Sequence, residues 1–202
     1  MSIAAFYNWY DRIKIFNVGQ IRLILDPPSI SLPFFSDNGM SGHTVGGEWS
    51  LDIRPSDRFR VRGSYAFLRV QLTPDEKLLK KYEALRQSAG LDESVVDAWL
   101  TSKQGKSPHH QASLRTSWTI RKGVEADLGI RFVDALPAIG IGRYVGLDSR
   151  IAWKWTFWPP VEWFIVGLNL IDRTHREFDE QPSPFGSTRI QRGVYAGFRL
   201  EF

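Results

Sequence analysis

The chain has 202 residues and a formal charge of +4, from 26 lysines and arginines against 22 aspartates and glutamates. It has no cysteine, which excludes a disulfide, a thiolate metal site and a cysteine nucleophile. No stretch reaches the roughly 20 apolar residues of a membrane-spanning helix. Yet 13% of the residues are aromatic, including eight tryptophans, at a mean hydropathy of −0.25. This composition indicates surfaces that are apolar on one side and polar on the other.

Apolar and polar residues alternate with period two in stretches of about ten residues, which predicts β-strands. We expect eight strands, over residues 2–13, 47–54, 58–65, 112–121, 124–132, 150–156, 161–171 and 194–202. Short turns join them at one end, at 55–57, 122–123 and 157–160. The connections at the other end are long, at 14–41, 73–110, 134–146 and 172–191. Short turns at one end and long loops at the other are typical of outer-membrane barrels.

Two long connections contain predicted elements of their own. Residues 20–35 can form a small hairpin that turns at Asp26-Pro27-Pro28. The run Thr73-Pro74-Asp75-Glu76 has the pattern of a capping box with proline at the first helical position. The helix after it is expected to end at Gly90. Its apolar face holds Leu78, Leu79, Tyr82 and Leu85. A second short helix over 93–100 completes a helical insert near 74–100.

The polar face of the predicted strands indicates which solvent the apolar face meets. Charged side chains of both signs follow one another along it: Arg58, Arg60 and Arg62; Arg115 and Arg121; Glu125, Asp127 and Arg131; Arg150 and Lys154; Arg199 and Glu201. Such rows suit a wide, water-filled interior in which opposite charges pair. We therefore expect an all-β fold, an antiparallel up-and-down transmembrane β-barrel segment of about eight strands. A soluble sheet with its apolar face inside remains open as an alternative.

Large aromatic residues gather near the short-turn end of the predicted strands. They are Phe59, Trp118, Trp153, Trp155, Trp158, Trp163 and Phe202. Amphipathic rings are favoured at membrane–water interfaces, so this distribution indicates an aromatic girdle at one interface.

Three segments resemble the TonB-dependent outer-membrane receptors. The first is AAFYNWYDRIKIF followed by HTVGGEWSLDIRPSDRFRVRGSYAFL, which is similar to a late strand pair of that family. The second is SPHHQASLRTSW leading to VEADLGIRFVDALPAIGIGRYVGLDSRIAWKW. The third, GLNLIDRTHREF, is similar to the penultimate strand with its N-L-x-D motif, and IQRGVYAGFRLEF follows as a terminal strand that ends in phenylalanine. Together they cover nearly the whole chain in the family's order.

The resemblance implies a function and a place in the cell. Members of the family take up scarce nutrients, such as a ferric siderophore or cobalamin, through a plugged barrel of about twenty-two strands. TonB supplies the energy through a short box that precedes the plug. Residues 1–202 would be the C-terminal part of such a barrel, in the cell outer membrane, without plug or TonB box. The implied partners are outer-membrane lipid and lipopolysaccharide, the barrel-assembly machinery, the TonB complex through the missing plug, and the ligand. Neither a cofactor nor nucleic acid is implied.

The resemblance also orients the strands, because the terminal Phe202 of such a barrel lies on the periplasmic side. The short turns would then be periplasmic, and the long loops would be extracellular and would meet the ligand first. The candidate ligand contacts in these loops are His109, His110, Arg143, Tyr144 and His175. The alternative is that they are ordinary polar loop residues, since no metal-ligand spacing joins the histidines. The barrel-assembly signal would consist of Val194, Tyr195, Ala196, Phe198, Leu200 and Phe202.

Other constellations are weaker. The arginine row at 58, 60 and 62 can bind an anion, but pairing with neighbouring acids is the simpler interpretation. The acids Asp172, Glu177, Asp179 and Glu180 can hold a cation or form a solvated loop. No nucleophile lies beside a base and an oxyanion element, so we predict no catalytic residue, no metal site and no enzyme.

Three hypotheses about function remain open. The first is a receptor fragment that transports nothing by itself. The second is a free-standing eight-stranded barrel that acts as a small pore or adhesin, and the third is a soluble β-sheet binding module. Residues 1–6 lack the basic region of a signal peptide, which counts against the second.

Overall fold

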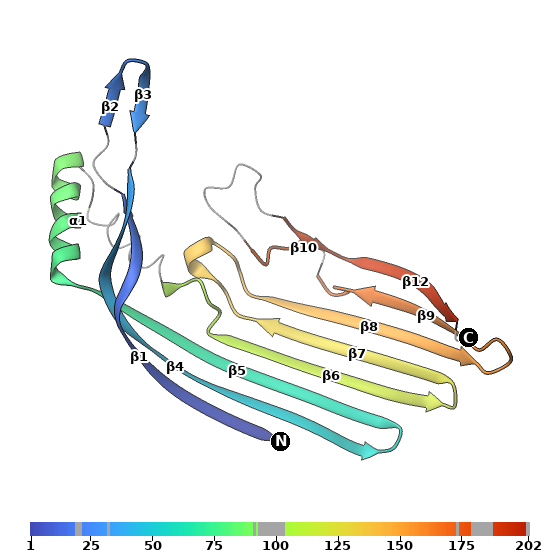
Figure 1. Ribbon diagram of the computed structural model, residues 1–202. Coiled ribbons are helices and arrows are strands. Elements are labelled where there is room, and N and C mark those ends of the chain that lie inside the picture. Colours follow the sequence, from blue (N-terminus) through green and yellow to red (C-terminus); the bar gives the residue numbers. More distant parts are fainter. Residues whose placement is uncertain are drawn as a thin grey trace. The chain divides into compact units, whose positions relative to one another are not determined.

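The computed structural model describes residues 1–18, 22–31, 33–90, 92, 104–172, 174–178 and 188–200. Its main feature is one eight-stranded sheet in the order β1-β4-β5-β6-β7-β8-β9-β12 (Figure 1). The strands are β1 (Ser2–Val18), β4 (Phe34–Ser56), β5 (Phe59–Pro74), β6 (His110–Arg121), β7 (Val124–Val133), β8 (Tyr144–Trp155), β9 (Val161–Leu168) and β12 (Gly193–Leu200). Each strand pairs with the next large strand along the chain, and the pairs from β5 onward are antiparallel in their register. The predicted order of eight strands, each beside the next along the chain, is therefore confirmed, and the antiparallel direction is confirmed from β5 to β12.

Smaller elements lie in the connections. The hairpin of β2 (Arg22–Leu25) and β3 (Pro28–Ser31) turns at Asp26 and Pro27, as predicted. A two-residue ladder joins β10 (Thr174–His175) to β11 (Ile190–Gln191). The helices are α1 (Glu76–Ala89) and the short 3-10 helix η1 (Pro137–Ile139). The second predicted helix, over 93–100, lies outside the described residues.

The strand ends differ from the expectation in several places; β5 extends to Pro74 instead of residue 65, and β8 begins at Tyr144 instead of residue 150. Strands β1 and β4 continue well into the region 14–41 that was expected to be a loop. Strand β9 ends at Leu168 instead of residue 171, because Asn169 has a φ of 52° and turns the chain. The turn at 122–123 is as predicted, and Gly123 has a φ of 79° there. A Cβ at Gly123 would lie 2.8 Å from the carbonyl oxygen of Lys154, so this turn requires glycine.

Helix α1 begins later than its sequence pattern predicts. Its N-cap is Asp75, whose side chain accepts a hydrogen bond of 2.7 Å from the backbone N–H of Leu78. Thr73 and Pro74 instead belong to the end of β5, so the predicted capping box does not form. Gly90 closes the helix in the left-handed conformation, as expected. No helix among the described residues is long and apolar enough to cross a membrane.

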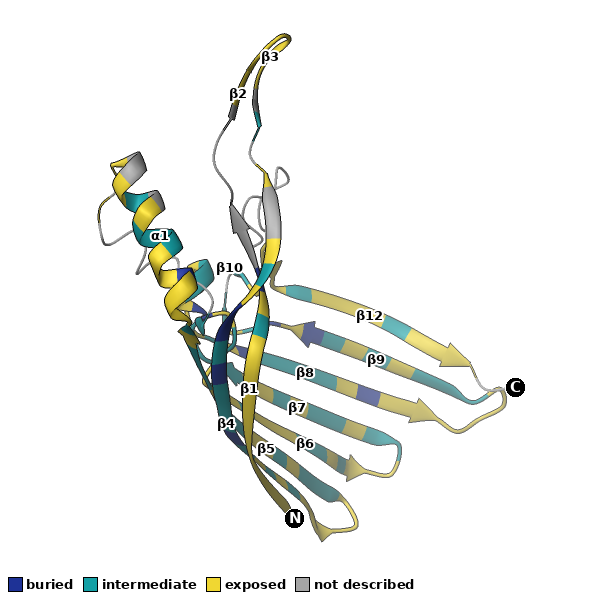
Figure 2. Ribbon diagram, turned by 60° about the vertical axis from the view of Figure 1, so that its left-hand side comes forward, coloured by how far each residue is buried: buried dark blue, intermediate teal, exposed yellow. Residues whose placement is uncertain are grey.

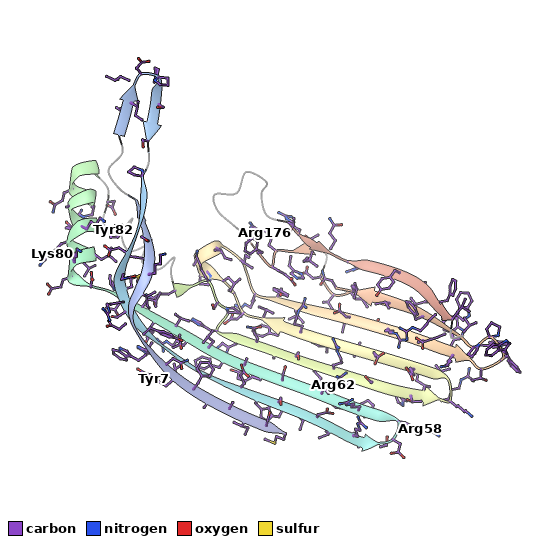
Figure 3. The ribbon with its side chains drawn as sticks, viewed as in Figure 1. Tyr7, Arg58, Arg62, Lys80, Tyr82 and Arg176 are labelled. Atoms are coloured by element: carbon purple, nitrogen blue, oxygen red, sulfur yellow. The ribbon has the colours of Figure 1, made fainter. Side chains whose placement is uncertain are left out.

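The chain forms two compact units, and it passes between them within β1, β4 and β5. One comprises residues 7–45 and 69–104 and has a small core of Ile15, Met40 and Leu78. Tyr82 packs against this core from α1, while Lys80 points the other way (Figure 3). The other unit comprises residues 1–6, 46–68 and 105–202 and consists mainly of the sheet from β5 to β12.

Candidate functional site

One face of the sheet from β5 to β12 is apolar, and the strand register defines its members. They are Phe59, Val61, Gly63, Tyr65 and Phe67 of β5; His110, Ala112, Leu114, Thr116 and Trp118 of β6; Val124, Ala126, Leu128, Ile130 and Phe132 of β7; Val145, Leu147, Ser149, Ile151, Trp153 and Trp155 of β8; Val161, Trp163, Ile165 and Gly167 of β9; and Val194, Ala196, Phe198 and Leu200 of β12. None of these positions holds Asp, Glu, Lys or Arg. Arg121 pairs with Val124 at the short-turn end of β6, beyond a β-bulge, and is left outside the set. We call this surface the apolar face.

The apolar face is open to its surroundings. Apart from Gly167, none of its members is buried (Figure 2). Trp118 is 51% exposed, Ile151 53% and Val194 68%. Monomeric soluble proteins rarely expose a continuous apolar patch larger than a few hundred Å². A surface of this size therefore needs a cover, which is either lipid or another protein layer.

Aromatic rings gather at both ends of the apolar face. Near the short turns, the rings of Trp163 and Phe198 lie 5.3 Å apart across β9 and β12. At the loop end, His110 stacks on Tyr65 at 6.1 Å, and its Nδ1 lies 2.7 Å from the Tyr65 hydroxyl. The Phe67 ring is 5.2 Å from the same imidazole. The sequence indicated one aromatic girdle, and the register adds a second group of rings at the opposite end.

The opposite face, which we call the polar face, carries ion pairs. Arg150 of β8 is their centre: it lies 3.2 Å from Asp127 and 3.8 Å from Glu125, and it contacts Glu162 of β9. Arg60 forms a two-pronged pair with Asp52. The Arg150 side chain is 28% exposed and that of Glu162 is 16% exposed, so solvent screens this group incompletely. The pairing expected for the polar rows is thus present around Arg150 and Arg60.

A second polar cluster forms where the loop after β9 meets β7 and β8. His175 stacks on Tyr144, with ring centroids 4.0 Å apart, and its side chain is 8% exposed. Its Nε2 lies 3.2 Å from Glu177, which also accepts a 2.9 Å hydrogen bond from Arg131. Its Nδ1 lies 3.2 Å from Asp172 but without hydrogen-bond geometry. These contacts tie the last loop to the ends of two strands.

The electrostatics of this cluster act on Glu177. Partial burial raises the pKa of Glu177, but hydrogen bonds to His175 and Tyr144 and the positive charge of Arg131 outweigh that effect. The net result is a pKa below the ordinary value of 4.5, so the carboxylate is held in its charged form. In the described part of the chain, no three His, Cys, Asp or Glu side chains are arranged to hold a metal ion. Asp179 and Glu180 lie outside the described residues.

The structure brings together two of the five predicted ligand residues. Tyr144 and His175 belong to the cluster just described, whereas Arg143 next to Tyr144 is exposed. His110 opens β6 and lies among aromatic rings on the apolar face. His109 is exposed, and its carbonyl accepts a hydrogen bond from Leu68 N–H. Whether any of them binds a ligand stays a prediction.

The predicted assembly signal coincides with β12 over its described length. Val194, Ala196, Phe198 and Leu200 lie on the apolar face, and Tyr195 lies on the polar face. Phe202 is outside the described residues. Strand β12 pairs with β9 alone, so its other edge is open in the described sheet.

Two residues of the loop cluster were missed as site residues. Arg131 was assigned to a charged row of β7 and Glu177 to an acidic loop, and they lie 46 positions apart in the sequence. No spacing pattern joins them, so only the fold reveals their contact. No protein-family model and no curated protein matches the chain. The geometry defines a class of fold: an antiparallel β-sheet with one exposed apolar face and one charged face.

Proposed function

We propose that the chain is the C-terminal barrel segment of a TonB-dependent outer-membrane receptor that takes up a scarce nutrient such as a ferric siderophore or cobalamin. The observation that carries the proposal is the apolar face, which has no Asp, Glu, Lys or Arg over six neighbouring strands and is exposed along its length. Lipid is the cover that fits it, because outer-membrane strands alternate apolar outward residues with polar inward ones.

The spacing of the aromatic rings supports this proposal. Phe59 and Phe67 are eight residues apart on β5, which is about 26 Å at the usual rise of about 3.3 Å per residue. With a typical tilt of about 40°, the two ends lie about 20 Å apart along the membrane normal. The apolar band of such barrels is about 25 Å tall, so aromatic rings at both ends fall near its borders.

The edges of the sheet favour a segment of a wider barrel. Strands β1 and β12 each pair on one side in the described sheet, and they do not pair with each other. An open edge leaves backbone N–H and C=O groups without partners, which hydrocarbon does not tolerate. Further strands of the receptor would pair with these edges. The loops near Tyr144 and His175 would capture the ligand. A plug outside these 202 residues would couple transport to TonB.

The experiment is to read the genomic frame upstream of codon 1 and to express everything that it encodes. The proposal predicts a signal peptide, a plug and further strands in frame, with recovery of the product in the outer membrane and TonB-dependent uptake of a ligand. A stop codon directly upstream, with a short product that folds in detergent and shows heat-modifiable mobility, would instead establish the free-standing barrel.

A further inference from the structure

The acidic side chains in the centre of the polar face are already engaged. Asp52 is bound by Arg60, and Glu125, Asp127 and Glu162 surround Arg150. The carboxylates therefore neutralise two of the arginines on this face.

Arg62 and Arg115 are direct cross-strand partners in the β5–β6 register, so two like charges project side by side from the polar face. Within the described residues, neither has an ion pair or a hydrogen bond to an acidic side chain, and both are exposed. Figure 3 labels Arg62 in the part of β5 nearer its short turn from β4. Like charges directly opposite each other destabilise a sheet. An anion between them would reverse the sign of that interaction.

The surroundings of this arginine pair form a concave site. Two adjoining hollows of about 280 and 300 Å³ share Arg62, Arg115, Gly129 and Asp148. Gly129 follows Arg115 in the same row across the sheet, and its lack of a side chain leaves room for Arg115, whose Nε would lie 4.0 Å from a Cβ there. In the next row, the hydroxyls of Ser64 and Ser113 lie 2.8 Å apart, and Arg131 completes this edge of the first hollow.

The charges lining the hollows are unequal. Four guanidinium groups, from Arg62, Arg115, Arg131 and Arg150, stand against the carboxylates of Asp127 and Asp148. Arg150 is paired with Asp127, and Arg131 with Glu177 outside the hollows, which leaves Arg62 and Arg115 against Asp148. One oxygen of Asp148 accepts a hydrogen bond of 2.8 Å from the backbone N–H of Asn169. This acid is therefore partly satisfied by the backbone on the side away from Arg62 and Arg115. The favourable end for negative charge is therefore the Arg62–Arg115 end.

We propose that Arg62 and Arg115 form a binding site for a multivalent oxyanion of the phosphate or sulfate class. A guanidinium presents parallel N–H donors that match two oxygens of such an anion, and two facing guanidinium groups can engage all four oxygens. The serine hydroxyls supply neutral donors at the rim. The site depends on the sheet alone, so it holds whether or not the apolar face contacts lipid.

The test is a titration of the full chain in detergent micelles with inorganic phosphate, followed through the side-chain Nε–H signals of its arginines by NMR. Phosphate is expected to move the Arg62 and Arg115 signals in a saturable way. Chloride at the same ionic strength is expected to leave them nearly unchanged. Arg115→Gln should weaken phosphate binding at least about tenfold, because it removes charge-assisted hydrogen bonds.

Two further variants protect the test against misfolding and against simple charge effects. Arg54→Gln removes one positive charge from the same face outside the hollows and should change phosphate affinity less than about twofold. Gly129→Leu keeps every arginine but fills the space beside Arg115, and should also weaken binding. Equal loss in the 54 and 115 variants, or shifts that chloride reproduces, would overturn the proposal. If acetate acts at lower concentration than phosphate, the site takes carboxylates and the assignment to multivalent oxyanions is wrong.

Discussion

Replacing Leu128 with arginine places a charge near the middle of the apolar face. Leu128 lies four residues from the start of β7 at Val124 and five from its end at Val133. At about 3.3 Å per residue, each strand end is roughly 13–17 Å away along the chain. The side chain is 41% exposed, so an arginine fits there without a steric clash. Its cost therefore depends on the solvent that the face meets.

In lipid, an arginine on the outer face of a barrel near the bilayer midplane costs about 2–4 kcal/mol. Since 1.36 kcal/mol is a factor of ten, the ratio of folded to unfolded protein should fall about 30- to 900-fold. In water, the same change exposes a charge in place of an apolar group and should alter stability by no more than about 0.5 kcal/mol.

The assay is urea-induced unfolding in phospholipid vesicles of the complete product of the upstream frame, whose further strands pair with both edges, followed by tryptophan fluorescence. Thr119→Arg is the matched control, because Thr119 pairs with Glu125 on the polar face and receives the same charge. We expect this control to unfold within about 0.5 kcal/mol of the original protein. A Leu128→Arg variant as stable as the control would refute the assignment of this face to lipid.

Three further changes test the polar contacts and the helix. Arg150→Met leaves three carboxylates without their shared cation. It should lower the free energy of unfolding by about 1–3 kcal/mol in the urea assay, and an unchanged free energy would contradict the ion-pair account. Asp75→Ala removes the N-cap of α1 and should lower the stability of the helix by about 1 kcal/mol, seen as faster amide hydrogen exchange in its first turn. The folded pKa of Glu177 is below 4.5, so its contribution is present above about pH 4.5 and is lost as the pH falls through that folded pKa. Exchange of the β10 amides, corrected for intrinsic rates, should speed up on acidification, and Glu177→Gln should abolish this pH dependence.

The strands could be predicted because each has an apolar face and a polar face along its whole length. In β7, for example, Ala126, Leu128 and Ile130 face one way, while Glu125 and Asp127 face the other. A period of two then appears in the sequence itself. The strand order followed as well, because short turns leave antiparallel neighbours as the simple solution.

Strand ends were harder to predict because they depend on pairing and not on periodicity. The pattern at Thr73 satisfies the rules for a capping box, yet β5 extends to Pro74 and Asp75 becomes the N-cap. At the other end of the chain, the apolar run after Val161 continues past the strand. Asn169 ends β9 there by adopting a left-handed conformation that no local sequence pattern predicts.

The polar contacts could not be predicted from the sequence, for a similar reason. Charges of both signs on one face were evident, but their partners depend on the register between strands. Arg150 meets Asp127 and Glu162, which are 23 and 12 positions away. The facing of Arg62 and Arg115 is likewise a property of the β5–β6 register. Arg60 therefore pairs with an acidic side chain as expected, whereas Arg62 forms no ion pair among the described residues.

The contact of the apolar face with lipid is tested most directly by quenching tryptophan fluorescence in vesicles of brominated phospholipid. Single-tryptophan variants that retain Trp153 or Trp163, both on the apolar face, isolate the signal. The proposed function predicts strong quenching of both by bromines on the acyl chains and weak quenching by iodide in the water. Quenching by iodide with no effect of the brominated lipid would contradict the proposed function. A protein partner would then be the cover of the apolar face.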